Sequence, residues 1–214
     1  MKKSSRIIVA VLSVGLIAAF FFPLWFINLE APQYPEGLGL KIWLHQMGGD
    51  LNTINNLNHY IGMKKIYPES IPELKIMPYL LGFLIAGGLL VAAFGKKWIL
   101  TLYMIIFLAV GTTGGIDFYL WGYDYGHNLD PHAAIKVPGM SYQPPVFGSK
   151  KLLNFTAHSY PDIGGSIIIL CGLMTVAVAL LEYRKAKTTF IQKKTIEKKG
   201  IFPKPEIHPE MVFG

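Results

Sequence analysis

The chain has 214 residues, of which 52% are hydrophobic and 15% are charged, and its formal net charge is +7. This composition is more apolar than a soluble protein of this length needs for its core, so it indicates a single membrane domain. The basic residues flank apolar runs and are not interleaved with aromatic ones, which argues against a nucleic-acid-binding protein. Cys171 is the only cysteine, which excludes an intramolecular disulfide and any CxxC motif.

Four apolar stretches are each about as long as the ~20 residues that an α-helix needs to cross a bilayer. They predict an all-α membrane protein with four transmembrane helices, at Ile7–Leu29, Ile76–Phe94, Trp98–Leu120 and Ile163–Leu181. Basic residues precede the first stretch, as in a signal peptide, but its length and the lack of a cleavage site indicate an uncleaved anchor. Three residues separate the second and third stretches, which predicts an antiparallel helical hairpin. Gly111 and Gly115 have a spacing at which helices pack closely in lipid.

Lysine and arginine are distributed unevenly between the two sides of such a membrane protein. Of the 20 basic residues, 13 lie before the first helix, in the hairpin turn or after the fourth helix. This bias predicts a multi-pass protein of the bacterial inner membrane with both termini in the cytoplasm. The expected domains are a transmembrane domain, 1–182, with two substantial extracytoplasmic loops, 30–75 and 121–161, and a basic cytoplasmic tail, 183–214.

The first loop is expected to contain two short helices, at 38–46 and 51–63. In the second of these, Leu51, Ile54 and Ile61 recur at helical spacing and predict an amphipathic helix. The second loop is punctuated by proline and glycine and is expected to be irregular and extended. Aromatic residues close to the helix ends fit an aromatic belt at the outer membrane surface: Trp25, Trp43, Tyr119, Trp121, Tyr123 and Tyr125.

Five of the six histidines fall in the two outer loops, together with three methionines, and only His208 lies in the tail. Imidazole and thioether groups are ligands that copper ions prefer, so this face has a composition suited to copper binding. His59 and Met63 are four residues apart on a predicted helix and would project from one face. In the second loop, four further candidates fall within nine positions: Asp124, His127, Asp130 and His132. The candidate metal ligands are His59, Met63, Asp124, His127, Asp130, His132 and His158.

The alternative interpretation is that these side chains are polar loop residues that only make hydrogen bonds. Asp117, one turn inside the end of the third helix, is open to either a structural or a proton or metal role. No spanning segment contains a histidine that could bind haem, and the sequence has no GxSxG, P-loop or HExxH motif. The sequence therefore does not predict an enzyme.

Several segments carry a resemblance to a known family: EAPQYPEGLGLKIW, INNLNHYIGMKKI, PELKIMPYLLGF, DFYLWGYDYGHNLDPHAAIKVPGMSYQPP and LLNFTAHSYPDIGG. In these the chain resembles a family of small four-helix bacterial membrane proteins from gene neighbourhoods for copper-site maturation of nitrous-oxide reductase. The resemblance covers nearly the whole chain except the lysine-rich tail and offers no catalytic motif. It implies a periplasmic copper-handling context. The chain lacks the cysteine-and-methionine motif of the copper lipoproteins of such clusters, so the resemblance does not extend to a chaperone role.

The leading hypothesis from the sequence is an accessory integral membrane protein that handles or docks copper at the periplasmic face. Its expected partners are the lipid bilayer and a periplasmic copper protein or membrane complex, and its expected cofactor is copper. Two other classes stay open. One is a structural or assembly subunit of a larger membrane complex without a metal. The other is a bundle that binds a lipid or small molecule between its helices, beneath the loops.

Overall fold

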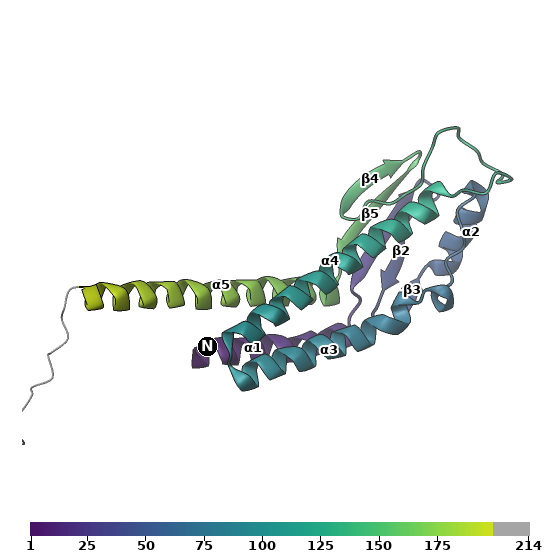
Figure 1. Ribbon diagram of the computed structural model, residues 1–214. Coiled ribbons are helices and arrows are strands. Elements are labelled where there is room, and N and C mark those ends of the chain that lie inside the picture. Colours follow the sequence, from purple (N-terminus) through teal and green to yellow (C-terminus); the bar gives the residue numbers. More distant parts are fainter. Residues whose placement is uncertain (199–214) are drawn as a thin grey trace, which may run out of the picture.

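The computed structural model describes the backbone of residues 1–198 and the side chains of residues 1–184, so His208 lies outside the described residues. Within them, the protein consists of a bundle of four long helices with a domain built on a β-sheet at one end (Figure 1). The bundle is formed by α1 (Lys3–Gly15) with the 3-10 helix η1 (Leu16–Phe20), α3 (Glu73–Phe94), α4 (Lys97–His127) and α5 (Ile163–Lys198). Each of the four contains a segment long and apolar enough to cross a membrane, which confirms that part of the sequence prediction.

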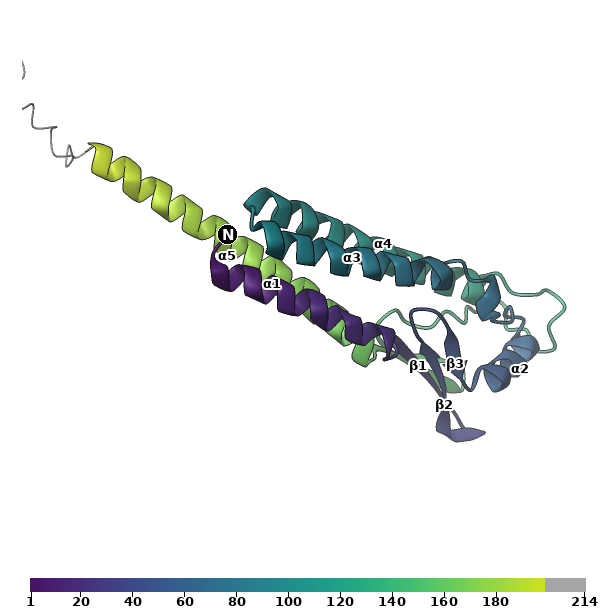
Figure 2. The same ribbon diagram turned by 90° about the horizontal axis from the view of Figure 1, so that it is seen from below.

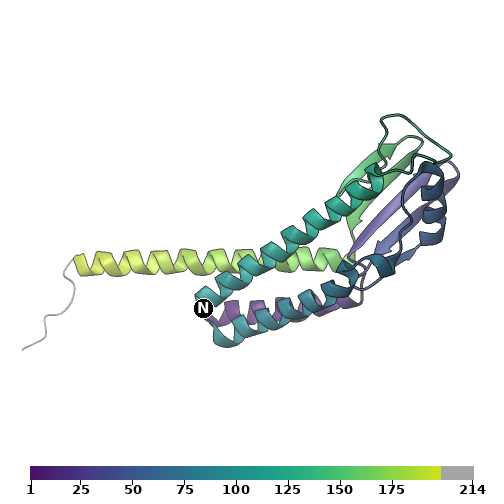
Figure 3. The same cartoon turned by 45° about the vertical axis from the view of Figure 1, so that its right-hand side comes forward.

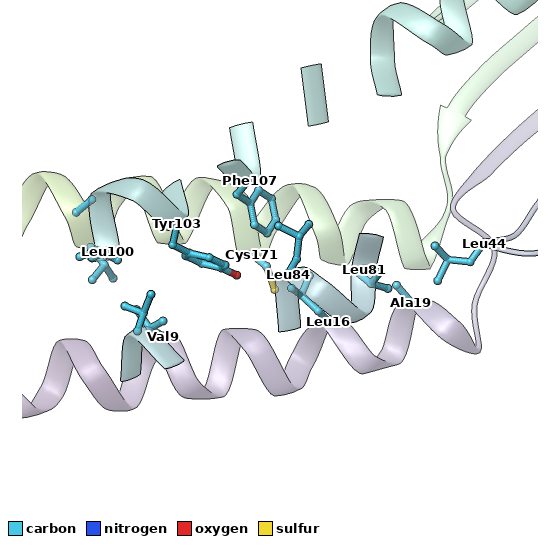
Figure 4. Close-up of a cluster of buried hydrophobic side chains, with 13 residues drawn as sticks. Val9, Leu16, Ala19, Leu44, Leu81, Leu84, Leu100, Tyr103, Phe107 and Cys171 are labelled. Carbon is cyan, nitrogen blue, oxygen red and sulfur yellow. The ribbon is translucent and has the colours of Figure 1, made fainter. Parts of the chain in front are cut away.

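The bundle is apolar both inside and outside. Inside, Tyr103 and Phe107 of α4 gather with Leu16, Leu84 and Cys171 from the other helices (Figure 4). The outer surface carries large exposed apolar side chains on all of these helices, among them Val11, Phe83, Ile105 and Leu173. Such a surface is unfavourable in water and favourable against lipid chains.

The connection between α3 and α4 is the tight hairpin that the sequence predicts. Gly95 ends α3 with a φ of +64°, and its N–H donates to the carbonyl of Val91 at 2.9 Å. Glycine adopts this left-handed conformation without steric cost, which suits it to end a helix.

The prediction of an all-α protein is wrong, because the residues between the helices form a five-stranded antiparallel sheet. The strands are β1 (Trp25–Ala31), β2 (Tyr34–Ile42), β3 (Met47–Gly49), β4 (Gly148–Leu152) and β5 (Phe155–Pro161), and their spatial order is β3-β2-β1-β5-β4. Both predicted loops contribute strands, and β1 pairs with β2 on one side and with β5 on the other. The two loops therefore form one folded domain.

The first apolar run does not form one helix to Leu29. The helix ends at Phe20, and β1 begins at Trp25, because Pro23 has no N–H for a helical hydrogen bond and the following Trp-Phe-Ile segment favours a strand. Leu24 joins the two elements, since its N–H donates to Ile42 at 2.7 Å and its carbonyl accepts from the N–H of Asp162 at 3.1 Å.

The predicted helix at 38–46 is also wrong, because its first five residues belong to β2. Leu38 and Leu40 are both buried, and they are two residues apart. This spacing is the period of a strand with one covered face. The prediction of an irregular second loop is wrong for its end, where β4 and β5 form a hairpin whose turn places Leu153 at a φ of +57°. By contrast, α2 (Leu51–Ile61) confirms the predicted amphipathic helix and ends at Gly62.

One face of the sheet is covered by α2 and by the end of α4 that extends beyond the bundle (Figures 2 and 3). The buried residues of this second core are Ile27, Leu38, Leu40, Ile54 and Ile66, and Trp121 and Tyr125 of α4 pack against them. A cavity lies in this layer.

Candidate binding site

A cavity of about 330 Å³ lies between the covered face of the sheet, α2, the end of α4 and the irregular segment 128–147. Most of its lining is apolar. The principal apolar lining residues are Ile27, Leu29, Leu38, Leu40, Ile54, Leu57, Ile61, Trp121, Tyr125, Tyr142, Leu152 and Phe155. Its volume is at the lower end of the range of about 300–1,000 Å³ that is usual for small-molecule pockets.

The sheet wall of the cavity follows from strand alternation. Ile27 lies opposite Leu40, and Leu29 lies opposite Leu38, in the register of β1 and β2. Because successive side chains of a strand point to opposite faces, these four residues share the covered face. The sequence therefore places a continuous aliphatic surface under α2.

Polar side chains at the start and in the middle of α2 hold it over this surface. At the start, a carboxylate oxygen of Asp50 accepts from the backbone N–H of Gly39 in β2 at 2.8 Å. Further along, the amide of Asn55 accepts from the N–H of Ile66 at 2.7 Å and donates to its carbonyl at 3.0 Å. This pair of hydrogen bonds fixes the segment after α2, so that Ile66 becomes part of the cavity wall.

The α4 wall depends on the absence of a side chain at Gly126. The N–H of Tyr142 donates to the carbonyl of Gly126 at 2.9 Å, and a Cβ at Gly126 would lie 2.3 Å from the backbone nitrogen of Gln143. Only glycine permits this approach of two backbones. Gly122, one turn earlier, lines the cavity, and a Cβ there would meet only the Gln143 Cγ, at 4.0 Å.

Two polar atoms of the lining residues are buried and lack a hydrogen-bond partner within the described part of the chain. They are the indole Nε1 of Trp121 and the hydroxyl oxygen of Tyr142. Tyr142 is only 2% exposed, and its ring stacks on Phe155 with centroids 6.4 Å apart. Both atoms are enclosed by other protein atoms, so neither is open to an occupant of the cavity.

Six of the seven candidate metal ligands lie on two adjoining segments, 59–64 and 124–132. The N–H of Asp130 donates to the carbonyl of Gly62 at 2.8 Å, and Lys64 forms an ion pair with Asp124 at 2.7 Å. These contacts bring the segment that carries His59 and Met63 beside the segment 124–132. Met63 also lines the cavity.

Several of these side chains have local partners. His127 stacks on Tyr123, with ring centroids 3.9 Å apart, and its Nδ1 lies 3.0 Å from the carbonyl of that residue. The backbone N–H of His132 donates to Asp130 at 2.8 Å, which lowers the pKa of that carboxyl. Among the residues whose side chains are described, no three histidine, cysteine or acidic side chains form a group that could hold a metal ion.

His158 lies apart from the other candidates. It is paired with Asn28 in the sheet register, so strand alternation places it on the face opposite to Ile27 and the cavity. There it is within 2.7 Å of the Ser149 hydroxyl and 3.6 Å of the Glu30 carboxylate. The structure therefore does not bring His158 together with His59, His127 and His132.

Sequence reasoning did not find the cavity. Trp121 and Tyr125 were expected in an aromatic belt, whereas both rings, with centroids 4.6 Å apart, form part of the cavity wall. The only local signal was Gly126, a glycine within a helical segment, which is compatible with a close approach of another backbone but does not identify it. The segment that makes the approach, around Tyr142, could not be identified from local sequence.

Comparison with protein-family models and with curated protein sequences found no match to this chain.

Proposed function

We propose that this protein is an integral membrane protein that binds a small apolar molecule in the cavity of its sheet domain. The observation that carries the proposal is the 330 Å³ cavity, which is lined mostly by apolar side chains and by no charged one. Binding sites of this kind are mostly apolar, with a few polar groups that orient the ligand. The bundle anchors the site, and the binding takes place in the sheet domain and not between the spanning helices.

The position of the cavity along α4 supports binding at the membrane surface. At ~1.5 Å per residue, Trp121 lies roughly 36 Å along the helix from Lys97, slightly more than the ~30 Å of a hydrocarbon core. Tryptophan is enriched at that level. The distribution of basic residues supports a periplasmic location of the sheet domain and cytoplasmic termini.

Site-resolved photolabelling tests the proposal, because it separates binding in the cavity from dissolution in the lipid. The protein is reconstituted in nanodiscs of ether-linked lipid and irradiated with decane that carries a diazirine group. We expect labelled residues among those that line the cavity, as well as on lipid-facing positions such as Phe83. Peptide mapping by mass spectrometry distinguishes the two.

The variant Gly122→Leu is designed to fill the cavity from its α4 wall. Gly122 lines the cavity, and a Cβ added there would meet only one side-chain atom, at 4.0 Å. We expect it to lose at least tenfold in cavity labelling and to keep the labelling of lipid-facing residues. Leucine is also a better helix former than glycine, by about 0.8 kcal/mol, so the variant should fold. Gly114→Leu is the matched control, because a Cβ at Gly114 meets nothing within 4 Å. Cavity labelling that is absent from the wild type, or unchanged in Gly122→Leu, contradicts the proposal.

Copper handling at the outer face is the second candidate function. The N–H of Asp130 donates to the carbonyl of Gly62, and this contact brings together two segments that carry histidine and methionine side chains. This observation favours the copper hypothesis. Copper content is measured in protein purified from copper-supplemented cells, with His59, Met63, His127 and His132 changed to alanine one at a time. Loss of copper in at least one variant is expected, and unchanged copper in all four removes this candidate.

A further inference from the structure

We infer that the cavity takes up its ligand from the aqueous phase beyond the membrane, with the apolar end of the ligand entering first. This inference rests on the proposed function and adds to it the route of entry and the polarity of the ligand. The ligand class is an uncharged amphiphile that reaches the site through water and not by lateral movement within the bilayer.

The first argument is the direction in which the cavity runs. β1 leaves the bundle at Trp25, shortly after η1, and β5 returns to the bundle at Pro161, shortly before α5. These strand ends therefore mark the side of the sheet that faces the membrane. The turns at 32–33 and 153–154 lie at the other end of the same strands. At ~3.3 Å per residue, Ala31 is roughly 20 Å along β1 from Trp25.

The second argument is the exposure of the lining residues, which changes along this direction. Near the bundle, Ile27 and Leu40 are each 3% exposed, and Gly122 is buried. At the remote end, the lining residues Gln33 and Asn154, one from each turn, are exposed. The cavity is therefore closed toward the membrane and accessible from the side of the turns.

Two more exposed residues line the cavity at its remote end. The N–H of Ile135 donates to the carbonyl of Tyr60 at 2.9 Å, and the two residues are 50% and 54% exposed. This contact joins the end of α2 to the segment 128–147, which lies at the end of the molecule away from the bundle (Figure 1). We call these four exposed lining residues, Gln33, Tyr60, Ile135 and Asn154, the mouth of the cavity.

The third argument is the difference in polarity between the two ends of the cavity. The mouth offers the side-chain amides of Gln33 and Asn154 and the hydroxyl of Tyr60, which can donate and accept hydrogen bonds. The inner wall around Ile27 and Leu40 offers aliphatic side chains. No lining residue is charged. Because a polar group buried without a partner costs free energy, the polar end of a ligand should stay at the mouth and its apolar end should lie innermost.

Blocking of the mouth tests the route of entry. In the ether-lipid nanodiscs, Asn154→Cys is modified with a maleimide that carries a long polyethylene glycol chain. The probe is decan-1-ol with a diazirine group, which is added to the surrounding water, and cavity labelling is followed over time. We expect labelling to become at least tenfold slower after the modification. The native Cys171 is 6% exposed and lies within the bundle, so the wild type treated in the same way should show no change.

Lys151→Cys is the matched control for the modification. Lys151 is exposed on the same hairpin, three residues before Asn154, but does not line the cavity. Its modification should leave the rate of cavity labelling unchanged. If Asn154→Cys does not label before modification, Gln33→Cys takes its place, since Gln33 contributes to the mouth from the β1–β2 turn.

The possible results separate the inference from the proposed function. Equal rates before and after modification of the mouth mean that the ligand enters from the lipid, which overturns the inference and leaves the proposed function intact. Absence of cavity labelling in the unmodified wild type overturns both.

Two isomers of the probe test the orientation of the ligand. One carries the diazirine near the hydroxyl, and the other carries it at the far end of the chain. We expect the first to label the mouth, at Gln33 and Asn154, and the second to label the inner wall, at Ile27 and Leu40. Identical labelling by the two isomers, or the reverse pattern, overturns the inference that the apolar end enters first.

Discussion

Replacement of Gly126 by alanine should lower the free energy of unfolding of the sheet domain by about 3 kcal/mol. The added Cβ would lie 2.3 Å from the backbone nitrogen and 2.4 Å from the Cα of Gln143, and backbone atoms cannot move aside as the end of a side chain can. The hydrogen bond from Tyr142 to Gly126 would lengthen or break. The change is measured by thermal unfolding in detergent and by hydrogen exchange of residues 141–147, whose protection should fall.

Gly122→Ala is the control for this substitution. It lies on the same helix, four residues earlier, and its Cβ meets only one side-chain atom at 4.0 Å. Because alanine favours a helix over glycine by about 1 kcal/mol, this variant should be at least as stable as the wild type. If Gly126→Ala unfolds at the same temperature as Gly122→Ala, the two backbones do not meet as described.

The helices of this protein could be predicted because a membrane-crossing helix has a strong local signal, a run of apolar residues of fixed length. The sheet has no comparable signal. Ile27 and Leu29 continue the first apolar run, and their strand pairs with residues near Ala157, about 130 positions away in the chain. A strand that follows an apolar helix without a polar break cannot be distinguished from that helix by hydropathy alone.

The candidate site, like the sheet, depends on contacts between residues that are far apart in the sequence. The His59 segment and the 124–132 segment lie side by side, which no local pattern in either segment shows. The cavity depends on residues from both loops, on the turn conformation at Gly62 and on the contact between Gly126 and Tyr142. Gly111 and Gly115 had the spacing of a packing motif, yet a Cβ at either would meet nothing within 4 Å. Spacing alone could not show which glycines are in contact.

The end of the bundle remote from the sheet is held by a buried carboxylate, Glu182 of α5, which is 3% exposed. One of its oxygens accepts from the N–H of Lys2 at 2.9 Å and from the hydroxyl of Ser5 at 2.6 Å. The other lies 3.4 Å from the ammonium group of Lys97, which also donates to the Glu182 carbonyl at 2.9 Å. Three helices, α1, α4 and α5, thus meet at one side chain.

Glu182→Ala should therefore lower the free energy of unfolding of the bundle by about 3 kcal/mol, since the Lys2 N–H and the Ser5 hydroxyl both lose their acceptor and Lys97 loses its ion-pair partner. Glu182→Gln should cost less, because its amide oxygen can still accept from Ser5. Thermal unfolding in detergent measures both, with Leu181→Ala as the control for loss of an exposed side chain at the same helix end. A melting temperature of Glu182→Ala no lower than that of Leu181→Ala would mean that the carboxylate is not what joins the helices. In that case the apolar contacts of α1 with α3 and α5 would have to hold this end of the bundle.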